Sequence, residues 1–183
     1  MKVVLATSNL HKAREFMAIF KSERMAIGFE TVATLELQSD SLEEIAVFSS
    51  IQAYTQLRRP LFVEDAGLFI NSLGGFPGPY SSYVYRTIGV EGVVKLVGHD
   101  RKATFVSVIA YYDGKSQPRI FRGSVKGQIA EVPRGRSGFG FDPIFIPAGY
   151  DTTFAELGLR RKMTVSHRSR SALRLIRWLR RQG

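Results

Sequence analysis

The stretch K-V-V-L-A-T-S-N-L-H-K-A-R-E-F, residues 2–16, decides the fold class. The segment from Lys2 to Ala6 is mostly apolar, which predicts a buried strand. It stops at Thr7-Ser8-Asn9, and apolar residues then recur at the spacing of a helix, at Leu10, Ala13, Phe16, Met17 and Phe20. A strand that leads through a short loop into a helix is a building unit of α/β folds.

The loop Thr7-Ser8-Asn9 predicts an anion site. The first backbone N–H groups of a helix have no partner within the helix, and the positive end of the helix dipole lies there. Lys12, one turn into the helix, adds a positive charge. The structural alternative is that Ser8 or Asn9 caps the helix while Lys12 is solvated, which is commoner for an isolated S-N-x-x-K pattern. The loop is not a Walker A loop, which requires G-x-x-x-x-G-K-[ST].

Two patterns extend this start along the chain. Ser41-Leu-Glu-Glu44 matches a capping box, so we expect a second helix to begin near residue 41. Leu61 to Val63 predicts a short central strand that ends at Glu64-Asp65-Ala66-Gly67. Asp65 would then follow a buried strand, where a short side chain is rigidly placed, and Gly67 would let the backbone approach a ligand closely.

The middle of the chain predicts a long hairpin. Ala103 to Tyr112 and Arg119 to Ile129 are strand-like, with Asp113-Gly114-Lys115 at the turn, although Pro118 could shift it. Gly135 to Tyr150 is rich in Gly and Pro, which predicts a loop. Strands that precede helices early, followed by a hairpin, indicate an α/β fold with a mixed rather than a purely parallel sheet.

Composition bounds the function. A chain of 183 residues with 44% hydrophobic and 23% charged residues fits a single domain over residues 1–183, or two lobes that share a core. The absence of Cys excludes disulfides, thiolate metal sites and Cys nucleophiles. The apolar run at the amino end is too short for a signal peptide, and no stretch reaches the roughly 20 apolar residues that a bilayer requires. We therefore expect a soluble, cytoplasmic protein.

The formal charge of +10 is concentrated at the carboxyl end. Nine of the 26 Lys and Arg residues lie from Leu157 to Gly183, where there is no acidic residue, so the rest of the chain is nearly balanced. Within Ser169 to Arg181 one helical stripe is apolar and another is basic: Ala172, Leu173, Ile176 and Leu179 against Arg170, Arg174, Arg177 and Arg181. An amphipathic helix with a solvated Arg face is the simpler interpretation, and a surface for phosphate or RNA is the alternative.

Six motifs along the whole chain resemble those of the inosine triphosphate pyrophosphatase family, the XTP/dITP diphosphatases. They occur in that family's order and spacing: T-S-N-L-H-K (7–12), E-L-Q (36–38), F-V-E-D-A-G-L (62–68), G-G-F-P-G-P-Y-S-S (74–82), G-F-G-F-D-P-I-F-I-P (138–147) and K-M-T-V-S-H-R (162–168). The resemblance implies an elongated, two-lobed α/β protein with a mixed sheet, flanking helices and a central substrate cleft. It also implies a homodimer that uses Mg²⁺, with Mn²⁺ as a substitute, to hydrolyse non-standard purine nucleoside triphosphates to the monophosphate and pyrophosphate. No membrane and no stable nucleic-acid partner are expected.

The resemblance also assigns the chemistry. Asp65 would bind the metal and act as the general base for the attacking water, and Glu36 would be the second metal carboxylate. Carboxylates suit this task because a triphosphate carries about four negative charges and needs a hard cation beside it. Glu43 and Glu44 are rivals of lower rank, since Glu44 belongs to the capping box. Glu64 should point away from Asp65 by strand alternation, as a structural residue or an outer partner of the metal.

Substrate binding is assigned by resemblance to fifteen residues: Thr7, Ser8, Asn9, Leu10, His11, Lys12, Ala66, Phe139, Gly140, Phe141, Asp142, Lys162, Ser166, His167 and Arg168. Phe141 would stack on the purine, which cannot choose between bases. The S-H-R segment would donate hydrogen bonds to the 6-keto oxygen, where adenine presents an amino group. Taken alone, His11 and His99 have no partner pattern, and no His metal site is expected.

Two positions depart from the family. Ala66 stands where many relatives have Ser, so a hydroxyl contact to phosphate is missing. Phe48 stands where some relatives have Lys, which leaves more of the triphosphate charge to Lys12. The G-G-F-P-G-P-Y-S-S segment should be architectural, although Ser81 or Ser82 could contact phosphate.

Two rival functions stay open. One is a pyrophosphatase of similar fold for pyrimidine or other modified nucleotides, against which S-H-R and F-G-F-D argue. The other is an RNA-interaction module that uses the Arg-rich helix, although this helix lacks interleaved aromatic residues.

Overall fold

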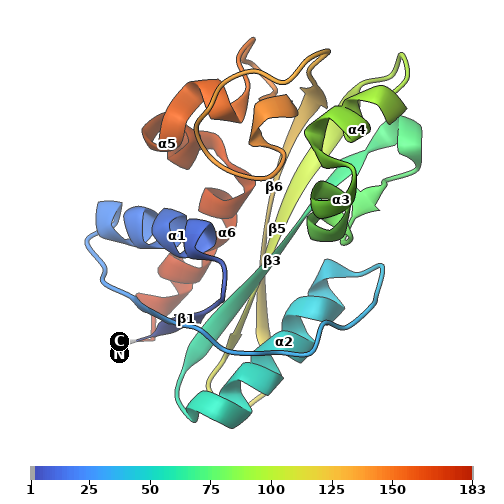
Figure 1. Cartoon of the computed structure of the whole chain (residues 1–183). Coiled ribbons are helices and arrows are strands. Elements are labelled where there is room, and N and C mark those ends of the chain that lie inside the picture. Colours follow the sequence, from blue (N-terminus) through green and yellow to red (C-terminus); the bar gives the residue numbers. More distant parts are fainter. Residues whose placement is uncertain (1–2, 183) are drawn as a thin grey trace. The chain divides into compact units, whose positions relative to one another are not determined.

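The computed structural model describes residues 3–182 and confirms the mixed α/β fold (Figure 1). Seven strands form one open sheet in the order β2-β1-β3-β5-β6-β7, with β4 paired to β3. The strands are β1 (Val4–Ala6), β2 (Gly28–Glu30), β3 (Leu61–Ile70), β4 (Pro77–Gly78), β5 (Lys102–Tyr112), β6 (Arg119–Ile129) and β7 (Phe145–Pro147). The helices are α1 (Leu10–Ser22), α2 (Leu42–Leu57), α3 (Ser81–Thr87), α4 (Gly89–Leu96), α5 (Phe154–Val165) and α6 (His167–Leu179), with short 3₁₀ turns at Asn71–Leu73 and Asp142–Ile144.

The chain divides into two compact units, neither of which is a continuous stretch of sequence. The first holds the described residues up to 65, residues 107–123 and the described residues from 168 on. The second holds residues 66–106 and 124–167. Strands β3, β5 and β6 contribute residues to both units. The single domain over residues 1–183, the elongated shape and the substrate cleft remain predictions.

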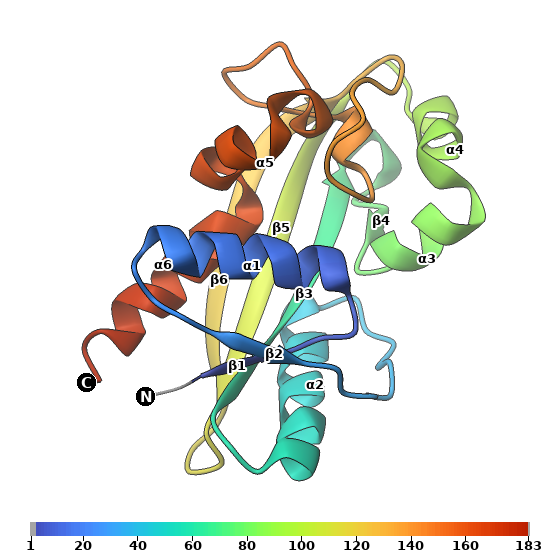
Figure 2. The same ribbon diagram turned by 60° about the vertical axis from the view of Figure 1, so that its left-hand side comes forward.

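The first unit has helices on both faces of its strands. β1 pairs in parallel with β2 and β3. Tyr111 and Tyr112 are successive residues of β5, so their side chains point to opposite faces. Tyr111 packs on Trp178 of α6 at 4.9 Å between ring centroids, and Tyr112 packs on Tyr54 of α2 at 5.0 Å. Helices α6 and α2 therefore cover opposite faces, and an ion pair places α1 beside α6 (Figures 1 and 2).

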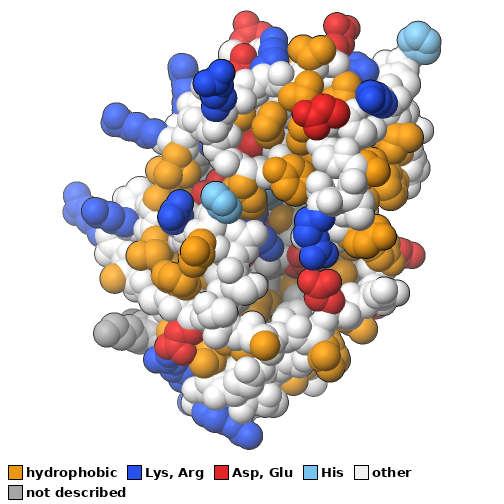
Figure 3. All heavy atoms as spheres, in the orientation of Figure 1, with side chains coloured by type: hydrophobic (Ala, Val, Ile, Leu, Met, Phe, Trp, Pro, Cys, Tyr) orange, Lys and Arg blue, Asp and Glu red, His pale blue; other side chains and the backbone are white. Residues whose placement is uncertain are grey.

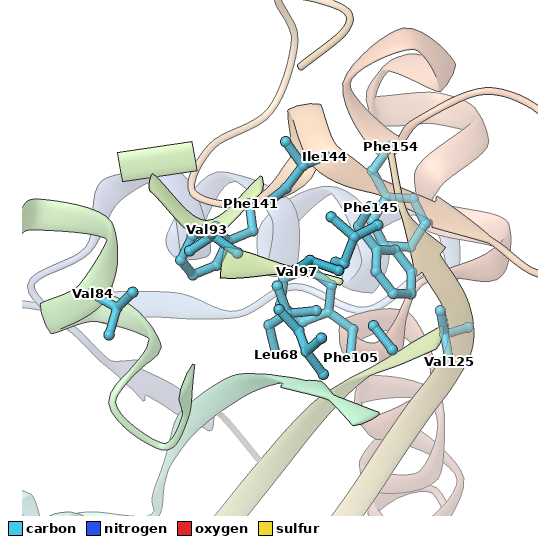
Figure 4. Close-up of a cluster of buried hydrophobic side chains, with 13 residues drawn as sticks. Leu68, Val84, Val93, Val97, Phe105, Val125, Phe141, Ile144, Phe145 and Phe154 are labelled. Carbon is cyan, nitrogen blue, oxygen red and sulfur yellow. The ribbon is translucent and has the colours of Figure 1, made fainter. Parts of the chain in front are cut away.

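The second unit is built around a cluster of buried aromatic and aliphatic side chains (Figure 4). β3 pairs with β4 and β6 with β7, both antiparallel. Phe105 of β5 is central, because its ring lies 5.1 Å from that of Phe145 and 6.3 Å from that of Phe154. Thr153 starts α5 with a true capping box: its hydroxyl accepts from Glu156 N–H, and the Glu156 carboxylate accepts from Thr153 N–H.

Several sequence predictions about elements hold and others need correction. The hairpin, the helix after Asn9 and the amphipathic terminal helix are confirmed, with Arg170, Arg174, Arg177 and Arg181 exposed. Lys and Arg side chains are also spread over the face that Figure 3 shows. The strand predicted to begin at Leu61 and to end at Glu64-Asp65-Ala66-Gly67 is too short, since β3 continues to Ile70. The reason is pairing: Leu68 and Phe69 form a ladder with Gly78 and Pro77, which extends the strand past the E-D-A-G motif. The predicted start at Lys2 lies outside the described residues.

Two smaller corrections concern a loop and a cap. The segment 135–150 is not all loop, because it contains a 3₁₀ turn and β7. Ser41 caps α2 by accepting from Glu44 N–H at 3.2 Å, but the Glu44 carboxylate accepts from Ser39 Oγ at 2.7 Å. Ser39 Oγ in turn accepts from Ser41 N–H at 3.0 Å, so a third side chain completes the predicted capping box.

Residues 3–182 include no helix with the length and apolar character needed to cross a membrane.

Candidate active site

The loop before α1 is a capped helix start. The Asn9 carboxamide accepts from the N–H groups of His11 and Lys12 at 3.0 and 3.1 Å, and Thr7 Oγ1 accepts from Asn9 N–H at 3.1 Å. The structural alternative is thus confirmed for Asn9, while Ser8 is exposed. The other half of that alternative is wrong, because the Lys12 side chain is not simply solvated.

Lys12 reaches from α1 to the middle of β3. Its ammonium donates to the Glu64 carbonyl at 2.9 Å and lies 3.0 Å from Glu64 Oε2 and 4.0 Å from Asp65 Oδ1. The Lys12 side chain is 18% exposed and that of Asp65 is 28% exposed, whereas that of Glu64 is fully buried. The expected alternation of Glu64 and Asp65 along the strand fits this difference in exposure. Lys12 and Asp65 therefore form a partly open, oppositely charged pair.

A buried ion network lies on the α1 and α6 side of β3. The Arg168 guanidinium at the start of α6 donates from Nε to Glu64 Oε1 at 3.1 Å and from Nη1 to Glu15 Oε2 at 2.5 Å. The side chains of Arg168 and Glu15 are 3% and 7% exposed. Phe62 points to the same face, where it packs on Phe16 of α1, because it lies two residues before Glu64. Charged groups buried this deeply must be paired to be tolerated.

Asp65 is the most accessible carboxylate of this cluster. Its ion pairs join the three carboxylates of Glu15, Glu64 and Asp65 to the two cationic groups of Lys12 and Arg168, an excess of one negative charge. Asp65 is partly exposed, as carboxylate ligands of Mg²⁺ that also contact substrate must be. Among residues 3–182, no three His, Asp or Glu side chains gather in a metal-binding arrangement.

Glu36 lies in the loop before α2. It is exposed, and the loop around it is tied to α2, because the Gln52 carboxamide bonds both Leu35 N–H and Leu35 C=O. The rivals Glu43 and Glu44 are engaged elsewhere: Glu43 lies 3.3 Å from Arg122 Nε, and Glu44 binds Ser39. Glu36 as a metal ligand remains a prediction, and its two rivals have these other contacts.

A second group of predicted residues lies in the second unit. Asp142 and Lys162 form a buried ion pair of 2.6 Å, with side chains 2% and 3% exposed. The same Asp142 Oδ2 accepts from Phe139 N–H at 2.9 Å, which holds the loop residues before it. Gly138 makes this possible, because a Cβ there would lie 2.0 Å from Asp142 Oδ2 and its φ is +81°. The Lys162 ammonium also lies 5.1 Å from the Phe139 ring centroid.

The aromatic residues of this group differ in burial. Phe141 is 3% exposed and belongs to the core cluster (Figure 4), with its ring edge-on to Tyr85 at 5.7 Å. Phe139 is half-buried, so it is the better candidate for stacking on a base. His167 is 2% exposed and stacks on Phe105 at 4.2 Å with the rings 3° apart.

The predicted residues thus fall into two sets. Lys12, Asp65 and Arg168 come together through Glu64 in the first unit, and Phe139, Asp142 and Lys162 come together in the second. Ser166, Gly140 and Ala66 belong to the second unit, and Thr7, Ser8, Leu10 and His11 line the capped turn of the first. Ser81 is structural, because its buried hydroxyl accepts from Leu68 N–H and donates to Gly78 C=O.

Sequence reasoning missed Glu15 and gave Glu64 no definite partner. A signal for Glu15 existed: it lies four residues before Ile19 within the apolar stripe of α1, where an acidic side chain needs a buried partner. Nothing in the sequence identifies that partner as Arg168, 153 residues away.

Fold and cluster together define an open, mixed-sheet α/β protein with a charged site on a central strand. Solved structures of the same fold include the Ham1 protein of Staphylococcus aureus (TM-score 0.85, 29% identity, covering 100% of both chains) and a HAM1 protein of Coxiella burnetii (TM-score 0.86, 29% identity, 99% of both). The Ham1 family model matches residues 3–178. The dITP/XTP pyrophosphatase of Hyperthermus butylicus is 48% identical over 99% of this chain and 96% of its own, and that of Methanopyrus kandleri is 48% identical over 97% and 96%. The chain belongs to the Ham1 family.

Proposed function

We propose that this chain is a nucleoside triphosphate pyrophosphatase that hydrolyses ITP, dITP and XTP to the monophosphate and pyrophosphate. The names of its relatives support this activity and two of these three substrates, dITP and XTP. The observation that carries the proposal is the pair formed between β3 and α1: the partly exposed Asp65 carboxylate of β3 and the Lys12 ammonium of α1, 4.0 Å away and also paired with the buried Glu64. A carboxylate beside a fixed cation can serve a metal, a water molecule and an anionic substrate.

The roles follow from the chemistry of the groups. Asp65 and Glu36 would hold Mg²⁺ through hard oxygen ligands. When bound, the ion neutralises charge on the triphosphate and on the departing pyrophosphate. Asp65 takes a proton from the water that attacks the α-phosphorus, and the bond from that phosphorus to the bridging oxygen breaks. Lys12 binds phosphate oxygens and stabilises the charge that moves onto pyrophosphate.

Base recognition is proposed for the second unit. Phe139 stacks on the purine, which contributes affinity without choosing between bases. Ser166 and His167 supply donors to the 6-keto oxygen of hypoxanthine or xanthine. Adenine presents its own donor there, so one buried donor would lack an acceptor at a cost of about 1–3 kcal/mol.

A panel of triphosphates tests the proposal. ITP, dITP, XTP, ATP, GTP, CTP and UTP are each incubated with Mg²⁺ and with EDTA, and released pyrophosphate and orthophosphate are measured separately. We expect pyrophosphate from the three non-standard purines, far less from the others, and none with EDTA. Faster release from a pyrimidine, release of orthophosphate, or turnover in EDTA would each contradict the proposal.

We also propose that the protein acts as a homodimer, as its resemblance to the pyrophosphatase family implies. Sedimentation equilibrium should give twice the chain mass of 20.5 kDa. A mass of one chain at micromolar concentration would contradict this.

A further inference from the structure

Two buried hydroxyl groups extend the ion network beyond its charged members. Ser107 of β5 and Ser171 of α6 are both fully buried in the first unit, and their Oγ atoms lie 2.8 Å apart. Ser107 Oγ donates to Glu64 Oε1 at 2.7 Å, and Ser171 Oγ donates to the Arg168 carbonyl at 2.9 Å. The serine pair therefore contacts both the Glu64 carboxylate and the turn of α6 that carries Arg168, the partner of Glu64.

The proton count fixes the direction of these bonds. A hydroxyl has one proton and an ionised carboxylate only accepts, so Ser107 donates its one hydrogen bond to Glu64. The bond between the two serines must then be donated by Ser171, which shares its proton between Ser107 Oγ and the Arg168 carbonyl. The chain runs in one direction, from Ser171 through Ser107 to Glu64.

The Glu64 carboxylate connects the serine pair to Lys12. Its Oε1 accepts from Ser107 and from Arg168, while its Oε2 lies 3.0 Å from the Lys12 ammonium. Fixing one oxygen of a rigid carboxylate fixes the other, and so fixes where the ammonium lies relative to Asp65. We propose that Ser107, supported by Ser171, is a positioning residue that sets the place of Lys12 for triphosphate capture. This inference rests on the proposed function.

The first variant is Ser107→Ala. It removes a hydrogen bond to a charged group but orphans no donor, because the Ser171 proton still has the Arg168 carbonyl, so the protein should fold. Ser50→Ala is the matched control: Ser50 is also fully buried in the first unit, but its hydroxyl bonds only Val47 C=O within α2. We expect Ser107→Ala to raise KM for ITP about fivefold and to lower kcat by less than Lys12→Ala does, because a misplaced ammonium keeps part of its interaction with the phosphates in both the ground and the transition state. Ser50→Ala should change neither.

A conservative variant and a double mutant separate positioning from packing. Ser107→Cys keeps the size and a weak S–H donor, so its KM should lie between those of the native protein and Ser107→Ala. Ser171→Ala alone should raise KM less than Ser107→Ala does. Added to Ser107→Ala it should raise KM no further, because it acts through Ser107. Equal and additive effects of the two variants would overturn the inference.

A readout independent of activity keeps the inference apart from the proposed function. Brief treatment of the ligand-free protein with acetic anhydride, followed by mass spectrometry, measures how fast each Lys is acetylated. Lys12 should react several-fold faster in Ser107→Ala than in the native protein or Ser50→Ala, with exposed Lys21 of the same helix as internal reference. If ITP is not a substrate but Lys12 reactivity rises, only the proposed function fails. Native reactivity of Lys12 together with a native KM would show that the serine pair is packing alone.

Discussion

Replacing Arg168 by Met should destabilise the fold far more than an ordinary Arg substitution. The guanidinium is 3% exposed and pairs with two carboxylates that are 7% and 0% exposed, those of Glu15 and Glu64. Breaking a buried pair by removing one partner typically costs about 3–5 kcal/mol, because the remaining charge stays buried without compensation. In a protein of this size each kcal/mol corresponds to about 2–4 °C, so the melting temperature should fall by about 6–20 °C.

Urea unfolding followed by circular dichroism at 222 nm measures this loss. The matched control is Arg177→Met on the exposed face of the same helix, which should change the free energy of unfolding by less than about 1 kcal/mol. Adding Glu15→Gln to Arg168→Met should recover part of the loss, since it neutralises a buried carboxylate whose ion pair with Arg168 has been removed. A loss below about 1 kcal/mol for Arg168→Met would refute the reasoning, because it would mean that the network contributes no more than a surface ion pair.

Four further outcomes are expected. Asp65→Asn should lower kcat by about 10²-fold or more, because the amide cannot accept the proton. The Kd of this variant for α,β-methylene-ITP should stay measurable by calorimetry. A near-native kcat would remove Asp65 from the mechanism. Lys12→Ala should raise KM and lower kcat for ITP, and normal steady-state kinetics would reduce the loop to a plain helix cap. Phe139→Ala should weaken kcat/KM for ITP and ATP by a similar factor of about 5–150-fold, corresponding to about 1–3 kcal/mol of stacking, and a loss for one nucleotide alone would contradict it. Burial, and secondarily Asp113, raises the pKa of Tyr111 to about 12; the free energy of unfolding should thus fall as pH rises from about 10 to 12, and Tyr111→Phe should remove that part of the slope in alkaline urea titrations.

Much of the fold was predictable because local signals agree with the tertiary structure. The apolar run before Thr7 and the helical spacing after it give β1 and α1, and the two strand-like segments on either side of Gly114 give the hairpin. Thr153 and Glu156 also carried a readable signal, since T-x-x-E is a capping box that the Gly- and Pro-rich surroundings obscured. Where periodicity and turn chemistry dominate, the sequence is a sufficient guide.

The rest depends on partners that are remote in sequence. The length of β3 follows from its pairing with Gly78, and no pattern around Gly67 announces that partner. The motif predicts that Arg168 binds the base of the substrate. In the structure two of its N–H groups donate to Glu15 and Glu64, which lie on different elements. Phe141 is buried in the core cluster, so Phe139, two residues earlier, is the better candidate for stacking on a base. Contacts between side chains that are far apart in the sequence produce no local sequence pattern from which they could be predicted.

Gly67 and Asp65 belong to the same short motif, but different requirements determine which residue each position can hold. A Cβ there would lie 2.5 Å from the Gly78 carbonyl oxygen and 2.8 Å from its carbon, so any other residue would have to displace β4. The space that the sequence suggested for a ligand is thus occupied by the protein's own backbone. Within E-D-A-G, the proposed function would constrain Asp65, whereas the pairing of β3 with β4 constrains Gly67. A descendant that lost the activity but kept the fold would be free to change Asp65 and would still be obliged to keep Gly67.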